Sequence, residues 1–390
     1  MPATIIPSSP SPMPSPSGPK GMRLSSGRRA IVILTTIGGL IFLIMFICIF
    51  LICKRRTRHQ DMEQEEEYGE LQGRPTRFTF QQLKVATEDF KEKLGEGGFG
   101  TVFKGHFGED IVAVKRLDQT GQGKREFLAE VQTIGGIHHI NLVRLIGFCA
   151  EKSHRLLVWI YYRQGSNTLP LDWRTRCKIV THIAKGLCYL HEECAKRIAH
   201  LDVKPQNILL DDNFNAKLSD FGLSKLIDRD TSQVVTRMRG TPGYLAPEWL
   251  TSQITEKADI YSFGVMVMEI ISGRKNLDTS RSEESVHRIT LLEKKVKNGQ
   301  LVDLIDEHNN DMQVHQQDAV QMMKLAMWCL QIDSKRRPQM SDVIKVLEGP
   351  MNVETNIDHN FVATSQTIFC IAGDVDSSSP QMASDISAPR

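Results

Sequence analysis

The densest group of side chains that could do chemistry lies in the stretch His200–Asn207. Asp202 and Asn207 stand five residues apart, and Asp220 follows at the start of a DFG sequence. Carboxylate and amide oxygens are hard ligands that suit Mg²⁺, while a carboxylate can also accept the proton of an incoming hydroxyl. A loop of solvated aspartates would not explain the order of these pieces, which an Ala-Pro-Glu sequence closes at 246–248. The order therefore predicts hydroxyl chemistry beside a divalent cation.

A glycine-rich stretch precedes these residues and reads LGEGGFGTV from Leu94 to Val102. Gly95, Gly97 and Gly100 fit the spacing G-x-G-x-x-G, in which glycine lets backbone N–H groups approach a phosphate. Dinucleotide-binding folds share this spacing but open a helix inside it. Here the strand-forming residues of TVF follow instead, so a hairpin that covers phosphates is favoured.

A lysine ends the next apolar run, Val112-Ala113-Val114-Lys115. Most strand lysines are edge residues, but a carboxylate follows on an amphipathic helix, at Glu130. A lysine that is held by a carboxylate and points at a nucleotide becomes a positioned charge. Glu126 lies one helical turn earlier on nearly the same face and is the alternative partner.

The elements that must position these residues change character along the chain. Short apolar runs between Gly or charged turns predict strands at 101–103, 111–114 and 156–158. One helix, 125–134, interrupts them, with Phe127, Val131 and Ile134 on one face. Later stretches are helical in pattern, namely 175–191, 258–271 and 320–331. The fold class is therefore α+β, with a small β-rich lobe followed by a larger α-helical lobe.

The regions outside this block differ from it in composition. Residues 1–29 form a Pro/Ser-rich leader that we expect to be disordered. Residues 30–53 contain no charge, and as a helix they would reach about 36 Å, enough to cross a bilayer core. The sequence therefore predicts a transmembrane helix at 30–53. A juxtamembrane linker is expected at 54–89, the folded domain at 90–348, and a flexible tail at 349–390.

Charge and cysteine content exclude several other classes. The 48 basic and 46 acidic side chains nearly cancel, which argues against nucleic acid as a partner. The eight cysteines have irregular spacings, which is not the pattern of a disulfide framework or a zinc site. Four basic residues flank the apolar segment on each side, so the positive-inside rule leaves its orientation open.

With these motifs in their order, residues from about Phe90 to Leu347 resemble a protein kinase domain. The match covers the Gly-rich loop, the strand lysine, the catalytic loop, DFG and APE. Longer stretches, such as GFCAEKSHRLLV and GTPGYLAPEWLTSQITEKADIYSFGVMVMEIISGRKN, resemble plant receptor-like kinases of the S-domain (bulb-type lectin) group. Lys204 fits the serine/threonine pattern D-x-K-x-x-N.

The resemblance implies a role for each matching residue. The implied catalytic set is Asp202, Lys204, Asn207, Lys115 and Glu130, with Asp202 accepting the hydroxyl proton. Mg²⁺ would be held by Asn207 and Asp220. ATP would contact a set drawn from the hairpin, the strands and the hinge: Leu94, Gly95, Glu96, Gly97, Gly98, Phe99, Gly100, Thr101, Val102, Ala113, Lys115, Trp159 and Tyr161. Structural roles are implied for Asp259, as a brace of the catalytic loop, and for a Glu248–Arg337 pair. The Thr241 hydroxyl is expected to reach Asp202 and Lys204.

Three departures from the family pattern stand out. Leu201 replaces the arginine expected before the catalytic aspartate, and no lectin module accompanies the leader. Between Val158 and Trp173 the chain is shorter than its relatives by about one ordinary helix of eleven residues. Either Trp159, Ile160 and Tyr161 serve as the hinge and the following helix is missing, or the hinge itself is lost.

Two functions follow from this combination. The first is a single-pass serine/threonine kinase of the plasma membrane, anchored in the bilayer by residues 30–53, with a cytosolic kinase domain, protein substrates and a possible ligand-binding co-receptor. The second is a catalytically impaired pseudokinase that acts as a membrane scaffold because of the short hinge region.

Overall fold

The computed structural model describes residues 37, 39–40, 42–51, 75–97, 100–117, 121–162, 171–227, 234–235, 240–251, 253–276, 288–307, 309–353 and 357–361. The chain divides into two units, residues 1–70 and 71–390. In the first unit, residues 42–51 are helical and carry exposed apolar side chains such as Phe42 and Phe46. No helix within the described ranges is both long and apolar enough to cross a membrane. Much of the predicted 30–53 helix lies outside those ranges.

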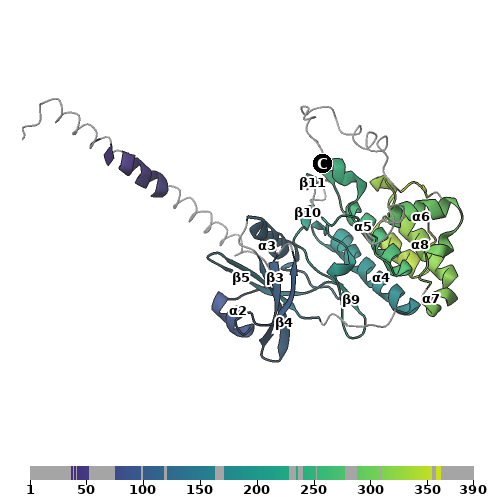
Figure 1. The fold of residues 1–390 in the computed structure, drawn as a ribbon, viewed down its shortest axis with the longest axis horizontal. Coiled ribbons are helices and arrows are strands. Elements are labelled where there is room, and N and C mark those ends of the chain that lie inside the picture. The colour runs from purple at the N-terminus through teal and green to yellow at the C-terminus, as the bar shows by residue number, and fades with distance from the viewer. Residues whose placement is uncertain are drawn as a thin grey trace, which may run out of the picture. The chain divides into compact units, whose positions relative to one another are not determined.

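The second unit begins with a sheet-based lobe (Figure 1). Its elements in chain order are β1 (Thr76–Arg77), α2 (Phe80–Ala86), β2 (Lys93–Gly97), β3 (Gly100–Phe107), β4 (Asp110–Leu117), α3 (Gly121–Ile134), β5 (Leu145–Glu151) and β6 (His154–Ile160). The strands form one six-stranded sheet in the order β1-β5-β6-β4-β3-β2. β1 pairs with β5 in parallel, and the other neighbours are antiparallel. The three strands predicted from the sequence lie inside β3, β4 and β6, which confirms the β-rich lobe.

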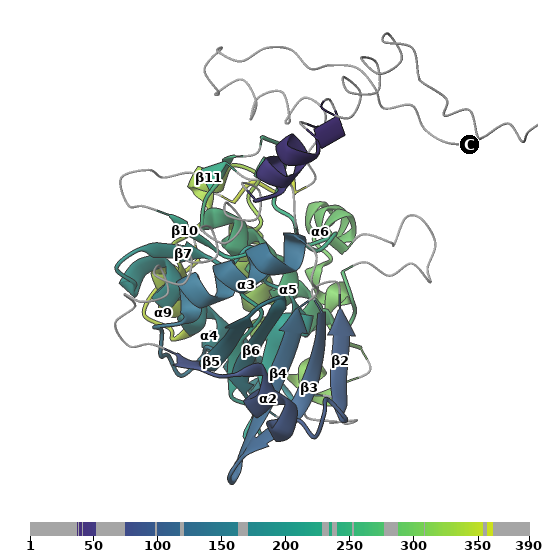
Figure 2. The same cartoon turned by 90° about the vertical axis from the view of Figure 1, so that its left-hand side faces the viewer.

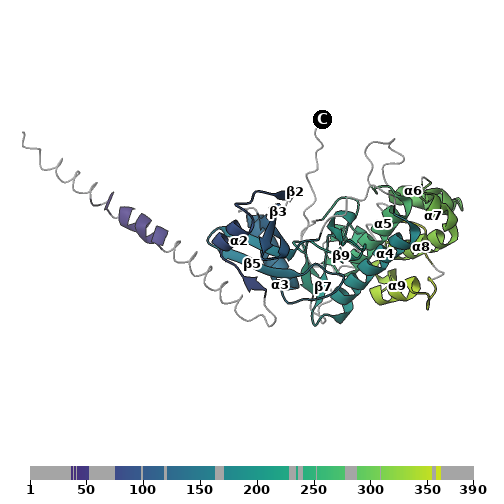
Figure 3. The same ribbon diagram turned by 90° about the horizontal axis from the view of Figure 1, so that it is seen from below.

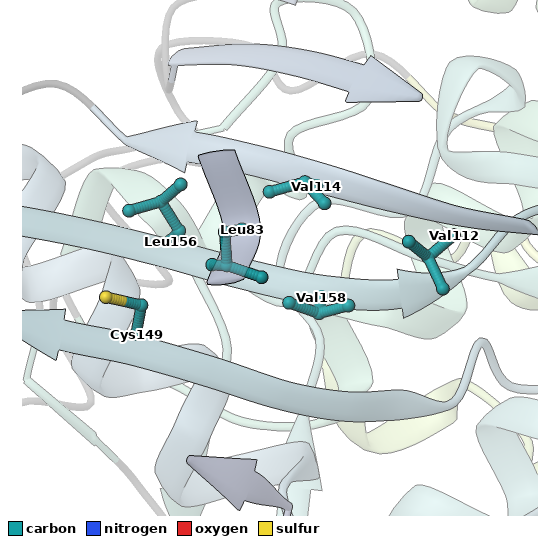
Figure 4. Packing of buried hydrophobic residues seen from close by; sticks show 6 residues of the cluster. All are labelled: Leu83, Val112, Val114, Cys149, Leu156 and Val158. Atoms are coloured by element: carbon teal, nitrogen blue, oxygen red, sulfur yellow. The ribbon is translucent and has the colours of Figure 1, made fainter. Parts of the chain in front are cut away.

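Alternation along β4 separates the two faces of this sheet. Val112 and Val114 are buried in a cluster that includes Leu83 of α2, as Figure 4 shows. Lys115 points to the opposite face, where it meets α3. Helix α3 lies over the sheet (Figure 2), and its predicted face of Phe127, Val131 and Ile134 is buried. Each face of the sheet is thus covered by one helix.

The boundary predicted for the linker differs from the structure. Residues 75–89 were assigned to the juxtamembrane linker, yet β1 and α2 are packed parts of the first lobe. Thr79 forms a capping box with Gln82 at the start of α2, and Leu83 is 0% exposed. Burying a leucine stabilises a fold by about 1.5–3 kcal/mol, so this segment contributes to the lobe that carries the site. Residues 75–89 were assigned to the linker because α2 is short and precedes the glycine motif.

The second lobe is mainly helical (Figure 3). Its helices are α4 (Trp173–Cys188), α5 (Lys257–Ser272), α6 (Arg288–Lys297), α7 (Asn310–Val314), α8 (Gln316–Cys329) and α9 (Met340–Leu347). Its short strands are β7 (Arg197–Ala199), β8 (Ile208–Leu210), β9 (Ala216–Leu218), β10 (Lys225–Ile227), β11 (Val234–Val235) and β12 (Gln253–Ile254). A π-helical turn, Tyr189–Glu193, continues α4, and short 3-10 turns occur at Pro205–Asn207, Pro247–Thr251, Leu301–Leu304 and Ser334–Arg336.

The centre of this lobe is α5, nearly all of whose side chains are buried. It packs closely on α8 at Gly264, where an added Cβ would lie 3.0 Å from the carbonyl oxygen of Ala326. The helix ends at Gly273, which has a left-handed conformation (φ 64°). The helices predicted from the sequence at 175–191, 258–271 and 320–331 correspond to α4 with its π turn, α5 and α8, so the α-helical lobe is confirmed.

Candidate active site

A cavity of about 780 Å³ lies between the two lobes. It is lined by most residues for which the sequence implied contact with a nucleotide: Leu94, Gly95, Glu96, Gly100, Val102, Ala113, Lys115, Trp159 and Tyr161. The charged and amide groups Glu130, Lys204, Asn207 and Asp220 line it as well. Gly97 and Thr101 belong to the hairpin strands without lining the cavity, and Gly98 and Phe99 lie outside the described residues. The structure therefore brings the predicted nucleotide contacts and the predicted charged and amide groups to the same cavity.

The glycine-rich stretch forms an antiparallel hairpin of β2 and β3, as expected, in which Gly97 pairs with Gly100. Gly100 has φ 130°, and a Cβ there would lie 2.2 Å from the carbonyl oxygen of Arg116. Only glycine fits that position. The need for glycine comes from the close approach of β4, and it keeps this wall of the cavity thin.

Lys115 is held by two carboxylates. Its Nζ donates to Glu130 Oε1 at 2.7 Å and to Asp220 Oδ1 at 2.7 Å. Burial lowers the pKa of Lys115, but these two carboxylates outweigh burial and raise it above its usual value. Burial raises the pKa of Glu130 to about 7, against the attraction of Lys115. Lys115 is therefore cationic at neutral pH, and it joins helix α3 to the DFG segment.

Of the two candidate partners on α3, the structure pairs Lys115 with Glu130. Glu130 is 0% exposed. Glu126 is also buried, and its Cβ lies near Gly222, the glycine of DFG. The two carboxylates thus lie one turn apart over the same loop.

The expected metal ligands fit a hard divalent cation. Asn207 donates through Nδ2 to the backbone oxygen of Asp202 (2.8 Å) and to Asp202 Oδ2 (2.9 Å), which leaves its Oδ1 as an acceptor. Asp220 uses Oδ1 for Lys115, and Lys115 holds the pKa of Asp220 below its usual value although burial opposes this. The described residues contain no cluster of three or more His, Cys, Asp or Glu side chains that could enclose a metal. Mg²⁺ commonly takes one or two protein ligands plus phosphate oxygens and water, and this donor set suits that role.

Asp202 is 5% exposed. Its side chain forms a ring of hydrogen bonds with the side chains of two other residues. Lys204 Nζ donates to Asp202 Oδ2 (2.7 Å) and to Thr241 Oγ1 (2.8 Å). Thr241 Oγ1 in turn donates to Asp202 Oδ1 at 2.8 Å. The predicted contacts of Thr241 with Asp202 and Lys204 are confirmed. Thr241 lies far along the chain from Asp202, so this hydroxyl ties the segment before APE to the catalytic loop.

Asp259 of α5 supports the catalytic loop through hydrogen bonds, as predicted. Asp259 accepts hydrogen bonds from the backbone N–H groups of His200 (2.7 Å) and Leu201 (2.7 Å). Leu201 has φ 66°, a conformation that costs a non-glycine residue about 1–2 kcal/mol. Its side chain is 6% exposed. The two bonds to Asp259 offset this strain and fix the backbone just before Asp202.

The strand that leads to the hinge is complete. Trp159 and Ile160 pair with Ala113 and Val112 of β4, and the N–H of Tyr161 donates to the Ile111 carbonyl (3.2 Å). Trp159, Ile160 and Tyr161 all line the cavity. This arrangement supports the reading in which these residues serve as the hinge. Residues 163–170 of the short connection lie outside the described residues.

Several lining residues were not predicted to contact the nucleotide: Val143, Tyr162, Gln206, Leu209, Ser219 and Thr241. Of these, Thr241 was expected near Asp202 but not in the cavity wall. Gln206 and Ser219 are neighbours in sequence of Asn207 and Asp220, which is a usable signal. Val143 and Leu209 are apolar residues in apolar surroundings, and nothing in their local sequence separates them from the core.

The second structural pair is also present. Arg337 donates to both carboxylate oxygens of Glu248, from Nη1 to Oε1 (2.6 Å) and from Nη2 to Oε2 (2.8 Å). Arg337 is 2% exposed and Glu248 7%. A bidentate, buried pair of this kind fixes the geometry of its two segments, here the APE sequence and the loop before α9.

Comparison with known proteins agrees with this geometry. The protein kinase domain family matches residues 89–346. The chain belongs to the protein kinase family. It is 49% identical over 304 residues to the G-type lectin S-receptor-like serine/threonine-protein kinase SD2-5 of Arabidopsis thaliana, a match that covers 74% of this chain and 37% of that protein. For SD2-2 of the same group and organism, the identity is 41% over 358 residues, with 86% and 45% covered.

A probable receptor-like protein kinase of Arabidopsis thaliana is 37% identical over 344 residues, which are 82% of this chain and 75% of that protein. These matches confirm the predicted resemblance to plant receptor-like serine/threonine kinases and the predicted enzyme class, an ATP-dependent protein kinase. The chain spans less than half the length of the two S-receptor-like relatives.

Proposed function

We propose that this chain is a membrane-anchored kinase that transfers the γ-phosphate of ATP to serine and threonine hydroxyls of protein substrates. The observation that carries the proposal is that two hydrogen-bonded groups of side chains lie along one cavity. Lys115 of the first lobe donates to Glu130 of the same lobe and to Asp220 of the second lobe. Asp202, Lys204 and Thr241 form the second group on the side of the second lobe.

Each side chain has a defined task in that reaction. Asp202, whose carboxylate is oriented by Lys204, Asn207 and Thr241, accepts the proton of the substrate hydroxyl. Lys115 attracts the phosphates, and Lys204 offsets charge where the phosphoryl group is transferred. When bound, ATP supplies the phosphoryl group, and Mg²⁺ held by Asn207 and Asp220 neutralises phosphate charge. Catalysis here is mostly positioning and electrostatic stabilisation.

The alternative, an ATP-poor pseudokinase scaffold, rests on the short connection between Tyr162 and Leu171. Against it stand the pairing of β6 with β4 and the retention of the charged and amide groups of the site. These are Lys115, Glu130, Asp202, Asn207 and Asp220, of which all but Asp202 line the cavity. A hinge binds adenine through backbone groups, which tolerate changes of side chain. We therefore favour the active enzyme.

Transfer to a generic basic protein tests the enzyme proposal. We expect the purified full chain, in detergent with ATP and Mg²⁺, to label serine and threonine but not tyrosine. Asp202→Ala should lose about 10²–10⁴-fold in rate, because that is the usual contribution of a positioned base. Absence of transfer by the wild type, or equal transfer by Asp202→Ala, would favour the scaffold.

The anchor is the second part of the proposal. Residues 30–53 are proposed to cross the bilayer once, with residues 90–348 as the kinase domain in the cytosol, where ATP and Mg²⁺ are available. The names of the relatives as receptor-like kinases support a membrane location, and we propose the plasma membrane. A ligand-binding co-receptor is proposed as a partner.

Fusion of residues 1–60 to a fluorescent protein tests the anchor. The reporter should sit at a membrane and be digested by protease once the plasma membrane is permeabilised. A matched fusion with Ile41, Met45 and Ile49 replaced by Asp should be diffuse, because charges at the centre of a span cost about 2.5–3.5 kcal/mol each. A protected reporter, or a diffuse wild-type fusion, would contradict the anchor or its orientation.

A further inference from the structure

A second cavity, of about 330 Å³, shares part of its wall with the nucleotide cavity. Ile160 and Tyr162 line both of them. The remaining walls come from the turn after α3, at His138 and His139, from Arg144 before β5, and from Lys217 in β9. The cavity therefore borders the segment that joins the two lobes.

The lining of this cavity is cationic. Arg144 and Lys217 are its basic side chains, and none of the described residues in the lining carries a carboxylate. The acidic groups that act on it are Asp211 and Glu193. Asp211 accepts hydrogen bonds within its own turn, from the backbone of Asn213 and from both the backbone and side chain of Asn215, and these neutral donors hold its carboxylate there. The basic side chains thus lie in the cavity wall itself, while the two carboxylates act on it from outside the described lining.

The Lys217 ammonium is placed for a ligand. It donates to the Ile140 carbonyl oxygen at 2.5 Å and lies 5.0 Å from the centre of the Tyr162 ring. An ammonium has three N–H donors, so this arrangement leaves donor capacity beyond the carbonyl. Burial lowers the pKa of Lys217 and outweighs the opposing effect of Asp211. A bound anion would compensate the ammonium for the water that burial removes.

Two further groups suit a tetrahedral anion. Arg144 is exposed, and its guanidinium offers a planar fork that matches phosphate oxygens. His139 accepts the Asn141 N–H at Nδ1 (3.1 Å), so its neutral ring, whose pKa burial lowers, carries its proton on Nε2 as a donor. Arg, Lys and an imidazole N–H together fit a phosphate better than a single planar carboxylate.

We propose that this cavity binds a phosphate group through Arg144 and Lys217, and that its occupancy changes the affinity of the neighbouring cavity for nucleotide. The coupling follows from the shared wall. The backbone carbonyl of Arg144 accepts the N–H of Ile160 at 3.3 Å, and Lys217 contacts the ring of Tyr162. A ligand that moves the Lys217 ammonium therefore acts directly on Tyr162, and one that shifts the backbone at Arg144 acts on Ile160, and both residues line the nucleotide site.

Calorimetry on the full chain tests binding. Inorganic phosphate is titrated against a chloride buffer of equal ionic strength, with and without a non-hydrolysable ATP analogue and Mg²⁺ to fill the first cavity. We expect one site whose affinity falls at least about tenfold in the double variant Arg144→Gln/Lys217→Gln, since charge-assisted bonds are lost. The control Lys294→Gln/Lys324→Gln removes the same charge from exposed positions on α6 and α8 and should leave the affinity unchanged.

A second titration shows whether the cavity binds a phosphorylated side chain or a free phosphate anion. A phosphoserine peptide and its unphosphorylated twin are compared with inorganic phosphate. Tighter binding of the phosphopeptide assigns the cavity to a phosphorylated side chain, while binding of inorganic phosphate alone assigns it to a free anion. No heat with either probe, or equal affinity of the double variant, overturns the proposal.

The coupling is measured with a fluorescent ATP analogue. Saturating phosphate probe should change its Kd by about fivefold, the lower end of ordinary coupling between sites, and the change should vanish in the double variant. An unchanged Kd overturns the regulatory part. Because phosphate binding can be measured on Asp202→Ala, a failure of catalysis and a failure of this site are separate results.

Discussion

Replacing Asp220 by asparagine is expected to reduce phosphate transfer by about 10³-fold. The side chain keeps its shape but loses the charge that Mg²⁺ would require, and it loses the charge-assisted bond from Lys115 (2.7 Å). Removal of one preorganised electrostatic group commonly costs about 10²–10³-fold, and Asp220 serves two partners. The initial rate of transfer at saturating ATP measures the effect.

A matched control is available in the neighbouring turn. Asp212 is exposed, so Asp212→Asn removes the same charge and should keep the wild-type rate. The Lys115–Glu130 pair remains in Asp220→Asn, so its Tm should stay within a few degrees of the wild type. A rate above one tenth of the wild type in a folded Asp220→Asn protein would show that Asp220 does not hold the metal.

Thr241→Ala is expected to lower the rate by about 10²-fold. The hydroxyl is bonded to both Asp202 and Lys204 at 2.8 Å, so its loss frees the two groups that must be aligned. Misplacing a catalytic group by about 1 Å commonly costs about 10²-fold. Thr241→Ser keeps the hydroxyl and should recover most of the rate, which separates a positioning role from a loss of packing.

The contrasting variant replaces Thr231, Ser232 and Thr236, the candidate phosphate acceptors between DFG and APE, all by Ala; these positions lie outside the described residues. Leu201 cannot pair with a loop phosphate because it has no charge or donor, and its side chain is buried. We therefore expect the triple variant to keep most of the rate after phosphatase treatment. A dead triple variant beside a nearly normal Thr241→Ala protein would contradict this account.

The sequence predicted those features that depend on local pattern or on an ordered set of motifs. Lys115, Glu130, Asp202, Asn207 and Asp220 were predicted from the order of their motifs, and the structure places Lys115, Glu130, Asn207 and Asp220 in the wall of one cavity. The helix and strand assignments held where periodicity was strong. Helix ends were less accurate: α3 begins at Gly121 rather than Arg125, since glycines at its start weaken the pattern.

Features that arise from tertiary contact could not be predicted in the same way. Leu83 belongs to a short helix before the glycine motif, and only the folded lobe reveals that it is buried in the core. Tyr162 lines both cavities, and its ring lies 5.0 Å from the ammonium of Lys217 in β9, far away in sequence. The left-handed backbone of Leu201 depends on Asp259, which is supplied by α5 from 58 residues later.

The proposed kinase requires that the short connection after Tyr162 leave an intact site for ATP and Mg²⁺. Calorimetric titration of the full chain with ATP, with and without Mg²⁺, measures this directly. We predict saturable binding at one site, tighter with Mg²⁺, that weakens at least about tenfold in Lys115→Met, because a charge-assisted contact is worth about 1.5–3 kcal/mol. Absence of saturable binding by the folded wild-type chain, or equal binding by Lys115→Met, would contradict it.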